Sequence, residues 1–161
     1  MLSEILLELD QLLKDRGCSL SVAESCTGGK IAASITTIDG CSAYFLGSVT
    51  SYSNSVKKNV LGVPSEIIEE FGAVSSECVA KMAEGVRRVT NSDFSIATSG
   101  IAGPTGATAD KEVGLVWIGY SSKTKTQTFK ANFSGDRVTN IDSFTERALE
   151  ILLHSIKMEL K

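Results

Sequence analysis

The sequence predicts an α/β protein, a three-layer α/β/α sandwich around a mixed, mostly parallel sheet of about five strands. In the first half of the chain, short apolar strands alternate with segments of helical periodicity, which is typical of parallel strands joined by crossover helices. Near the C-terminal end, two strand-like segments flank a short polar turn and predict a hairpin. A length of 161 residues with 42% hydrophobic residues favours one domain, residues 1–161.

The first elements are marked by apolar spacing and by glycines. A first amphipathic helix ends at Gly17. Its apolar face consists of Leu2, Ile5, Leu6, Leu9, Leu12 and Leu13. Residues 19–23 form a short strand, and residues 24–29 are the turn from that strand into a second helix, which stops before Gly40.

The segment from Ser42 to Tyr52 needs a turn if its two ends are to meet. A single strand would hold these residues roughly 33 Å apart, at about 3.3 Å per residue, so that they could not share a site. We therefore predict that Ser42 caps a helical turn over residues 43–46 and that Gly47 ends this turn in a left-handed conformation. A strand over residues 48–52 then returns toward the start, and a continuous strand would contradict this prediction.

The rest of the chain alternates in the same way. Three helices follow, with start signals at Ser53 or Asn54 (to about residue 61), at Pro64, and at Ser75 or Ser76 (to about residue 89). An apolar strand, residues 94–99, runs into a glycine-rich loop, residues 100–110. Residues 113–120 and 126–133 form the hairpin, and Asp136 opens the last helix.

Composition excludes several classes of function. A net charge of −3 argues against a broad contact with a nucleic acid. No apolar run approaches the ~20 residues of a membrane span, and the acidic first ten residues are no signal peptide, so we expect a cytoplasmic protein without membrane contact. The four cysteines lack C-x-x-C spacing, which gives a zinc site little support.

Ser42, Tyr52 and Lys57 form the first candidate group for chemistry. The sole histidine, His154, lies near the end of the last helix, so a serine nucleophile would need another base. If Asn54 caps its helix, Lys57 lies in the first turn, where the helix dipole and partial burial favour a neutral amine that can act as a general base. The alternatives are a helix cap for Ser42, an edge-of-core aromatic for Tyr52 and a surface lysine with an apolar stem for Lys57.

Two glycine-rich turns are candidates for binding an anion. The loop that begins with Ser99, Gly100 and Gly103 can converge backbone N–H groups, although it is neither a Walker loop nor G-x-G-x-x-G. The turn after the first strand offers a second set, consisting of Ser25, Thr27, Gly28 and Gly29. For the loop after Ser99, the alternative is an ordinary long loop without a function. In the turn after the first strand, Cys26 could be a nucleophile, and the alternative is a buried structural thiol.

Arg137 lies at or just inside the start of the last helix. A guanidinium there can bind a phosphate or a carboxylate through two hydrogen bonds. The alternative is a surface ion pair with Asp136, which contributes little.

These segments, in this order, make the chain resemble the CinA C-terminal domain family, the nicotinamide-nucleotide amidases. The resemblance runs from about residue 5 to about residue 155. The matching segments are Ala23-Glu-Ser-Cys-Thr-Gly-Gly, Gly40-Cys-Ser-Ala-Tyr-Phe, Thr50-Ser-Tyr-Ser-Asn-Ser-Val-Lys, Leu61-Gly-Val, Phe71-Gly-Ala-Val-Ser, Ser99-Gly-Ile-Ala-Gly-Pro, Gly114-Leu-Val-Trp and Phe133-Ser-Gly-Asp-Arg.

The resemblance implies a specific reaction, hydrolysis of the carboxamide of nicotinamide mononucleotide to nicotinic acid mononucleotide and ammonia. It implies the same three-layer sandwich, a stand-alone amidase domain that forms homo-oligomers, and no metal or other cofactor. The family's serine nucleophile falls on Ser42, its tyrosine and lysine on Tyr52 and Lys57, its functional arginine on Arg137, and its small hydroxyl residue on Ser99. Where the family often has Gly-Ser-Ser-Ala, this chain has Cys41 as the first of the two central residues.

Three hypotheses follow. In the first, Ser42 attacks the amide, Lys57 takes its proton, Tyr52 assists, and Arg137 with the Thr27–Gly29 turn holds the phosphate or the developing charge. The second is a nucleotide-binding module with little or no turnover. The third is a serine/lysine amidase that acts on another amide.

Overall fold

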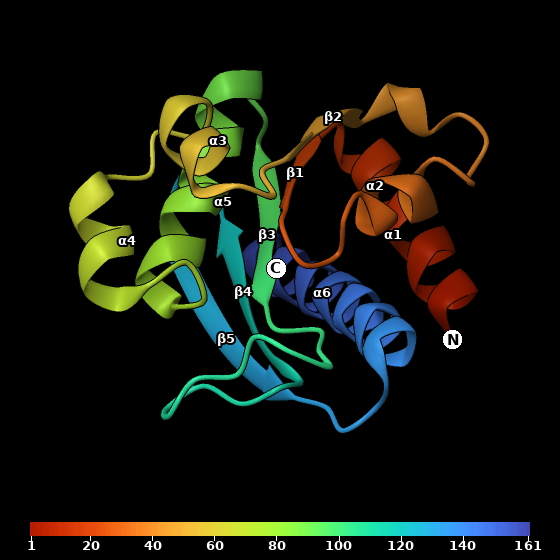
Figure 1. Ribbon diagram of the computed structural model, residues 1–161. Coiled ribbons are helices and arrows are strands. Elements are labelled where there is room, and N and C mark those ends of the chain that lie inside the picture. The colour runs from red at the N-terminus through yellow and green to blue at the C-terminus, as the bar shows by residue number, and fades with distance from the viewer.

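The computed structural model covers residues 1–161 and is built on one five-stranded sheet (Figure 1). In chain order the strands are β1 (Leu20–Glu24), β2 (Phe45–Thr50), β3 (Phe94–Gly100), β4 (Leu115–Ser121) and β5 (Thr126–Asn132). Their spatial order is β2-β1-β3-β4-β5. Because β1 pairs in parallel with β2 and β3, and β4 runs antiparallel to β3 and β5, every strand except β4 points the same way. The predicted mixed, mostly parallel sheet of five strands is confirmed.

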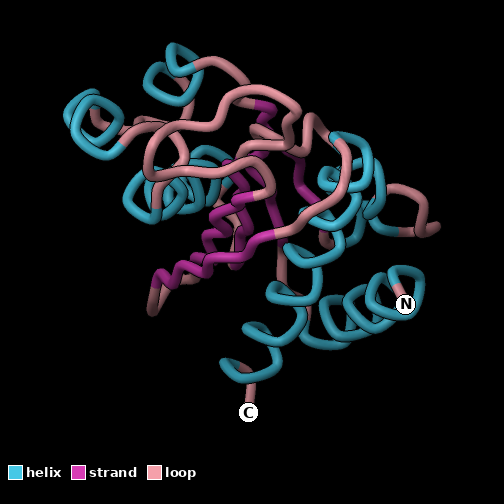
Figure 2. The backbone as a smooth tube through the Cα atoms, turned by 60° about the horizontal axis from the view of Figure 1, so that its bottom comes forward, coloured by secondary structure: helices cyan, strands magenta, loops and turns pink.

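Helices cover both faces of this sheet, as the ribbon and the tube both show (Figures 1 and 2). One face carries α1 (Leu2–Arg16), α2 (Lys30–Ile35) and α6 (Arg137–Glu159). The other carries α5 (Ser76–Thr90), with α3 (Asn54–Asn59) and α4 (Ser65–Phe71) beside it. The predicted three-layer sandwich is therefore confirmed. None of these helices combines the length and the apolar character that crossing a membrane requires.

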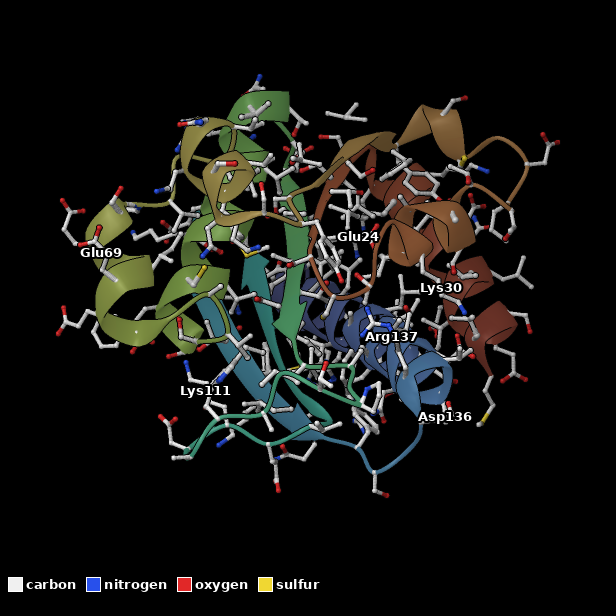
Figure 3. The ribbon with its side chains drawn as sticks, viewed as in Figure 1. Glu24, Lys30, Glu69, Lys111, Asp136 and Arg137 are labelled. Carbon is white, nitrogen blue, oxygen red and sulfur yellow. The ribbon has the colours of Figure 1, made fainter.

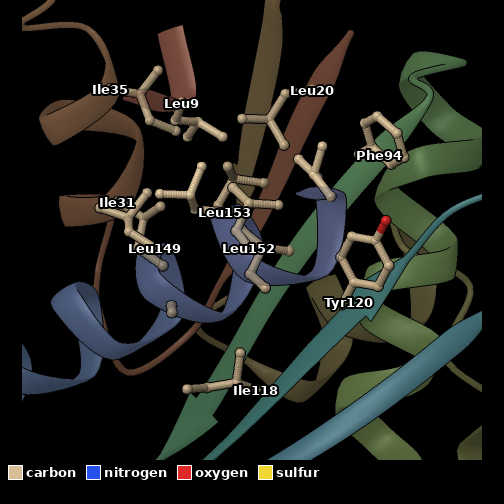
Figure 4. Packing of buried hydrophobic residues seen from close by; sticks show 14 of the residues in the cluster. Leu9, Leu20, Ile31, Ile35, Phe94, Ile118, Tyr120, Leu149, Leu152 and Leu153 are labelled. Atoms are coloured by element: carbon tan, nitrogen blue, oxygen red, sulfur yellow. The ribbon is translucent and has the colours of Figure 1, made fainter. Parts of the chain in front are cut away.

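Each face has its own hydrophobic core, which holds the layers together by removing apolar surface from water. The larger core packs α1, α2 and α6 on the sheet, with Leu9, Leu20, Ile31 and Leu152 among its fully buried residues (Figure 4). The smaller core lies under α5 and includes Met82, which is fully buried.

Helix starts follow the predicted capping residues. The hydroxyls of Ser53 and Ser75 accept the backbone N–H groups of Val56 and Cys78, at 3.3 and 3.1 Å, at the starts of α3 and α5. The carboxylate of Asp136 accepts the N–H of Thr139, at 2.8 Å, at the start of α6. Each cap satisfies a donor that the first helical turn leaves unpaired.

The predicted turn between Ser42 and Tyr52 is wrong. Cys41–Ala43 is a single 3₁₀ turn, and β2 then runs without a break from Phe45 to Thr50. Gly47 lies inside this strand with φ +149°, next to a shift in the register with β1. Residues 45–50 form a strand because they pair with the side of β1 that faces away from β3. Pairing along the whole of β2 satisfies more backbone groups than one helical turn would.

Candidate active site

The candidate site lies where parallel strands end. β1 and β2 are neighbours, and their last residues, Glu24 and Thr50, pair directly. The chain leaves β1 toward α2 on one face of the sheet and leaves β2 toward α3 on the other. Neighbouring strands whose connections part in this way leave a crevice at their carboxyl ends, where α/β proteins bind ligands. Ser25 and Ser51 are the first residues beyond these two strand ends.

The turn after β1 is fixed by a buried carboxylate. Glu24 is fully buried between β1 and α2 (Figure 3), and its two oxygens accept the N–H groups of Ile31 and Ala32, at 2.9 and 3.1 Å. The N–H of Ser25 donates to the carbonyl of Thr98 on β3, at 3.1 Å. Bonds on both sides of Ser25 therefore hold its hydroxyl at the strand end.

Lys57 meets Ser25 across this crevice. Its Nζ lies 3.0 Å from Ser25 Oγ, 2.7 Å from the carbonyl oxygen of Ser51 and 3.3 Å from that of Tyr52. Only 1% of Lys57 is exposed, and no carboxylate forms an ion pair with it. Burial lowers the pKa of the Lys57 amine, because the charged form loses its hydration without gaining a carboxylate partner.

This geometry suits a general base. A neutral amine has two N–H groups and one lone pair. The carbonyls of Ser51 and Tyr52 can accept the two N–H groups of Lys57, which leaves its lone pair for the Ser25 hydroxyl. A serine whose hydroxyl bonds a neutral amine is the arrangement that activates an oxygen nucleophile without histidine.

The pair borders a pocket of about 250 Å³. The pocket is lined by Ser25, Cys26, Tyr52, Gly100, Ile101, Ala102, Gly103, Thr105, Gly106 and Arg137. Arg137, at the start of α6 (Figure 3), donates from Nη1 to the carbonyl of Gly103, at 2.7 Å, and from Nη2 to the hydroxyl of Tyr52, at 3.2 Å. Tyr52 is 62% exposed, so these two side chains form the open rim of the pocket. Their cation and hydroxyl could hold an anionic group of a ligand.

Cys26 is the second possible nucleophile in this pocket, and its environment argues against that role. Burial raises the pKa of the Cys26 thiol to about 12. A thiol rather than a thiolate is a poor nucleophile at neutral pH. The arrangement therefore favours Ser25 for nucleophilic chemistry. No group of three or more histidine, cysteine, aspartate or glutamate side chains lies close enough to hold a metal ion.

The structure brings most of the predicted site residues together. Tyr52, Arg137, Ser25, Gly100 and Gly103 line the pocket. Lys57 lies behind Ser25 and contacts its hydroxyl.

Four residues of the predicted substrate-binding set lie outside the lining. Ser99 is buried and donates to the carbonyl of Ala73, at 2.8 Å, below α5. Thr27 is buried and bonds Thr98 Oγ1 at 2.8 Å, and Gly28 and Gly29 form the left-handed turn that leads into α2, with φ +62° and +104°. These four residues hold the loops around the pocket in place and do not line it.

Ser42 is not brought to the site. It lies exposed in the 3₁₀ turn before β2, whereas Tyr52 and Lys57 follow the other end of that strand. The six residues of β2 span roughly 20 Å, so Ser42 Oγ cannot contact Lys57 Nζ. The serine beside Lys57 is Ser25, which the sequence indicates only as an anion-binding residue. Its place directly after a buried strand is the signal that could have identified it.

This fold and this site define a class, an α/β domain in which a buried lysine contacts a serine at the carboxyl ends of its parallel strands. Residues 3–156 match the CinA C-terminal domain family, and the chain belongs to that family. A CinA-like protein of Endomicrobium trichonymphae is 50% identical over 142 residues, which are 88% of this chain and 33% of that protein. A CinA-like protein of Salinibacter ruber is 45% identical over 88% of this chain and 34% of its own length. The chain thus spans about a third of the length of these curated relatives.

Solved structures agree with this assignment. The crystal structure of the competence damage-inducible protein A from Klebsiella pneumoniae superposes with a TM-score of 0.94 at 33% identity, over 97% of both chains. The competence/damage inducible protein CihA from Agrobacterium tumefaciens gives a TM-score of 0.92 at 33% identity, over 95% of this chain and 94% of that one. The expected family membership is therefore confirmed.

Proposed function

We propose that this domain is an amidohydrolase in which Ser25 is the nucleophile and Lys57 is the general base. The observation that carries the proposal is the 3.0 Å contact between Lys57 Nζ and Ser25 Oγ, made by a lysine that is 1% exposed and has no acidic partner. The family resemblance supplies the substrate, nicotinamide mononucleotide, with nicotinic acid mononucleotide and ammonia as products.

The reaction has two halves. Ser25 Oγ attacks the carboxamide carbon while its proton passes to Lys57 Nζ, and the carbonyl oxygen becomes an oxyanion. The C–N bond then breaks, and the proton on Lys57 passes to the leaving nitrogen, which departs as ammonia. In the second half, water gives a proton to Lys57 and attacks the ester on Ser25. Collapse of that intermediate returns the proton to Ser25 Oγ and releases the carboxylic acid.

Arg137 and Tyr52 act on binding in this scheme. They lie at the open rim and are joined by a hydrogen bond, so a phosphate there would meet a guanidinium and a hydroxyl together. In this scheme the reacting carboxamide binds beside Ser25, which lines the same pocket.

The decisive experiment measures ammonia released from nicotinamide mononucleotide by wild type, Ser25→Ala and Ser42→Ala. Removing a serine nucleophile typically costs several powers of ten in turnover, so we expect Ser25→Ala to lose at least ~10³-fold in kcat. Ser42→Ala should keep wild-type kcat, since its side chain is exposed at the far end of β2.

Three results would contradict parts of this proposal. Full turnover in Ser25→Ala, with loss in Ser42→Ala, would return the nucleophile to Ser42. No ammonia from the wild type, together with a higher melting temperature when the nucleotide is added, would indicate a binding module instead of an enzyme. Ammonia from other carboxamides but not from this nucleotide would keep the serine–lysine chemistry and reject the substrate.

A further inference from the structure

We propose that Asn140 is a positioning residue for this reaction, because it holds the peptide between Ala102 and Gly103 so that the Gly103 N–H faces the pocket as an oxyanion donor. The proposal rests on the proposed function and adds to it the source of charge stabilisation. Asn140 is not itself one of the residues that line the pocket, and its hydrogen bond to the lining goes to the Ala102 carbonyl.

Asn140 is fully buried in the first turns of α6. Its Nδ2 donates to the carbonyl oxygens of Ala102 and Gly135, at 3.0 and 2.9 Å, and its Oδ1 accepts the N–H of Gly135 at 2.9 Å. Only this orientation of the side-chain amide satisfies two carbonyls and one N–H at once. One side chain therefore ties the loop after β3 to the segment that leads into α6.

The tie fixes which way the Ala102–Gly103 peptide faces. This peptide is trans, so its C=O and N–H point in opposite directions. The Ala102 carbonyl points to Asn140, and the Gly103 N–H therefore points away from it. No carbonyl or side chain of the protein accepts that N–H, and Gly103 lies on the pocket lining with Ser25.

Glycine makes such a tie necessary. Gly103 has φ +85°, a region that glycine enters without the steric cost that other residues meet, and a glycine tolerates either orientation of the preceding peptide. The next residue, Pro104, has no N–H, so the following peptide cannot supply a replacement donor. Asn140 is the contact that selects the orientation of the Ala102–Gly103 peptide, and the bond from Arg137 to the Gly103 carbonyl, at 2.7 Å, holds the peptide that follows it.

A fixed donor matters most for the transition state. The amide oxygen of the substrate becomes an oxyanion when Ser25 attacks, and an N–H already aimed at that oxygen stabilises it without reorganisation. Loss of this donor should lower kcat and leave KM almost unchanged, since the interaction strengthens only in the transition state.

Asn140→Asp is the sharpest test, because it keeps the shape of the side chain but replaces its two donated hydrogens with a second acceptor oxygen and a negative charge. The new carboxylate would face the Ala102 and Gly135 carbonyls, which favours a rotated peptide that donates the Gly103 N–H to it. We expect kcat to fall about 10²-fold, with KM changed less than about 3-fold. Asn140→Ser is the second variant, which removes the bond to Ala102 without adding a charge, and it should lower kcat in the same sense.

Thr145→Val is the matched control. Thr145 is also buried on α6, where its hydroxyl donates to the carbonyl of Ile141 at 2.8 Å, two turns from the pocket. It should lower the melting temperature and leave kcat intact. If the Asn140 variants fold and their kcat equals that of Thr145→Val, the proposal is overturned.

A crystal structure of Asn140→Asp tests the orientation of the Ala102–Gly103 peptide directly, without an activity assay. The expected result is an Ala102 carbonyl turned away from position 140, and an unmoved carbonyl in both Asn140 variants would reject the positioning role. If the wild type releases no ammonia, the proposed function fails. The crystal structures of the Asn140 variants would still show whether Asn140 sets the orientation of the Ala102–Gly103 peptide.

Discussion

At the scale of single residues, the proposed chemistry depends on the burial of one lysine. Lys57 follows a serine N-cap by four positions, and its stem runs inward between the two strand ends to reach Ser25. The sequence predicts a neutral lysine from the helix dipole and burial. In the structure α3 has only six residues, and burial is the main cause of the lowered pKa. Tertiary packing thus produces the lowered pKa that the proposed role of Lys57 as a base requires.

The activity should therefore depend on pH through Lys57. Because burial lowers the pKa of this amine, its neutral form is populated at lower pH than in an ordinary lysine, and kcat/KM should rise along an acid limb set by that pKa. The unfolded chain binds more protons than the folded one between the lowered and the ordinary pKa, so this residue makes stability rise with pH across that window. A pH profile of ammonia release measures the limb.

Lys57→Arg distinguishes a role of Lys57 as a general base from a role in holding the structure together. Arginine can still donate to the carbonyls of Ser51 and Tyr52, but it stays protonated and cannot accept the Ser25 proton. We expect at least a ~10³-fold loss of kcat at every pH. Lys58→Arg, at the exposed neighbouring position, should match the wild type. Retained turnover in Lys57→Arg would exclude Lys57 as the base.

The choice between Ser25 and Ser42 shows what a sequence can supply at this scale. Residue types and motifs identify both serines, as well as Tyr52, Lys57 and Arg137. The partner of Lys57, however, is set by a contact across 32 residues, which exists only because β1 and β2 pair in parallel with Glu24 opposite Thr50. Spacing along the chain contains no direct record of that pairing.

At the scale of elements, local signals predicted the helices well. The caps Ser75 and Asp136 act on donors within three residues, and apolar spacing within α1 and α6 reports one face of one helix. The prediction for β2 is wrong because the extent of this strand is decided by a partner strand more than 20 residues away in the chain. Gly47 lies next to a shift in the register with β1, and the strand continues past it to Thr50.

Gly85 allows α5 to pack closely against the backbone at Leu61, just after α3. A Cβ at this position would clash with the carbonyl oxygen of Leu61, a backbone atom that no side-chain rotation can move. Although alanine is the better helix former by about 1 kcal/mol, we expect Gly85→Ala to lower the free energy of unfolding by about 1–3 kcal/mol. Denaturant unfolding measures this difference.

Val89→Ala is the control for Gly85→Ala, since Val89 is exposed on the same helix. Its effect should stay within about 0.5 kcal/mol. Gly85→Ala should also reduce kcat, because the Leu61 segment is bonded back to α3, where the N–H of Val63 donates to the carbonyl of Lys57 at 3.0 Å. Wild-type stability in Gly85→Ala would mean that α5 can move away from this carbonyl at little cost.

At the scale of the whole molecule, the site is a property of one edge of the sheet. β1, β2, β3 and β5 all point toward that edge, so the turns that follow them, and the start of α6, meet there. The segments that follow β1 and β3 supply Ser25 and Gly103, helix α3 after β2 supplies Lys57, and the start of α6 supplies Arg137. The opposite end of α6 makes a different contact, because Glu159 there is hydrogen-bonded to the hairpin of β4 and β5.

That anchor is the carboxylate of Glu159. It accepts the hydroxyls of Tyr120 and Thr124 at 2.8 and 2.7 Å. Burial alone would raise the pKa of Glu159, but hydrogen bonds from the Ser122, Thr124 and Tyr120 hydroxyls outweigh it and hold this pKa below its usual value. A depressed pKa gives stability that is present above the ordinary glutamate pKa and is lost as the pH falls through the folded value.

Glu159→Gln should therefore lower stability at neutral pH and flatten its decline in acid. We expect a loss of about 1 kcal/mol at pH 7, because solvent still reaches the carboxylate, and a smaller fall in melting temperature than the wild type shows between about pH 6 and pH 3. Glu150→Gln is the control, since its partner Arg147 forms an exposed pair on the same helix, and it should leave the curve unchanged. Ammonia release at neutral pH should persist in both variants, because Glu159 and Arg137 lie at opposite ends of α6. Equal acid curves for wild type and Glu159→Gln would mean that the anchor contributes nothing to acid sensitivity.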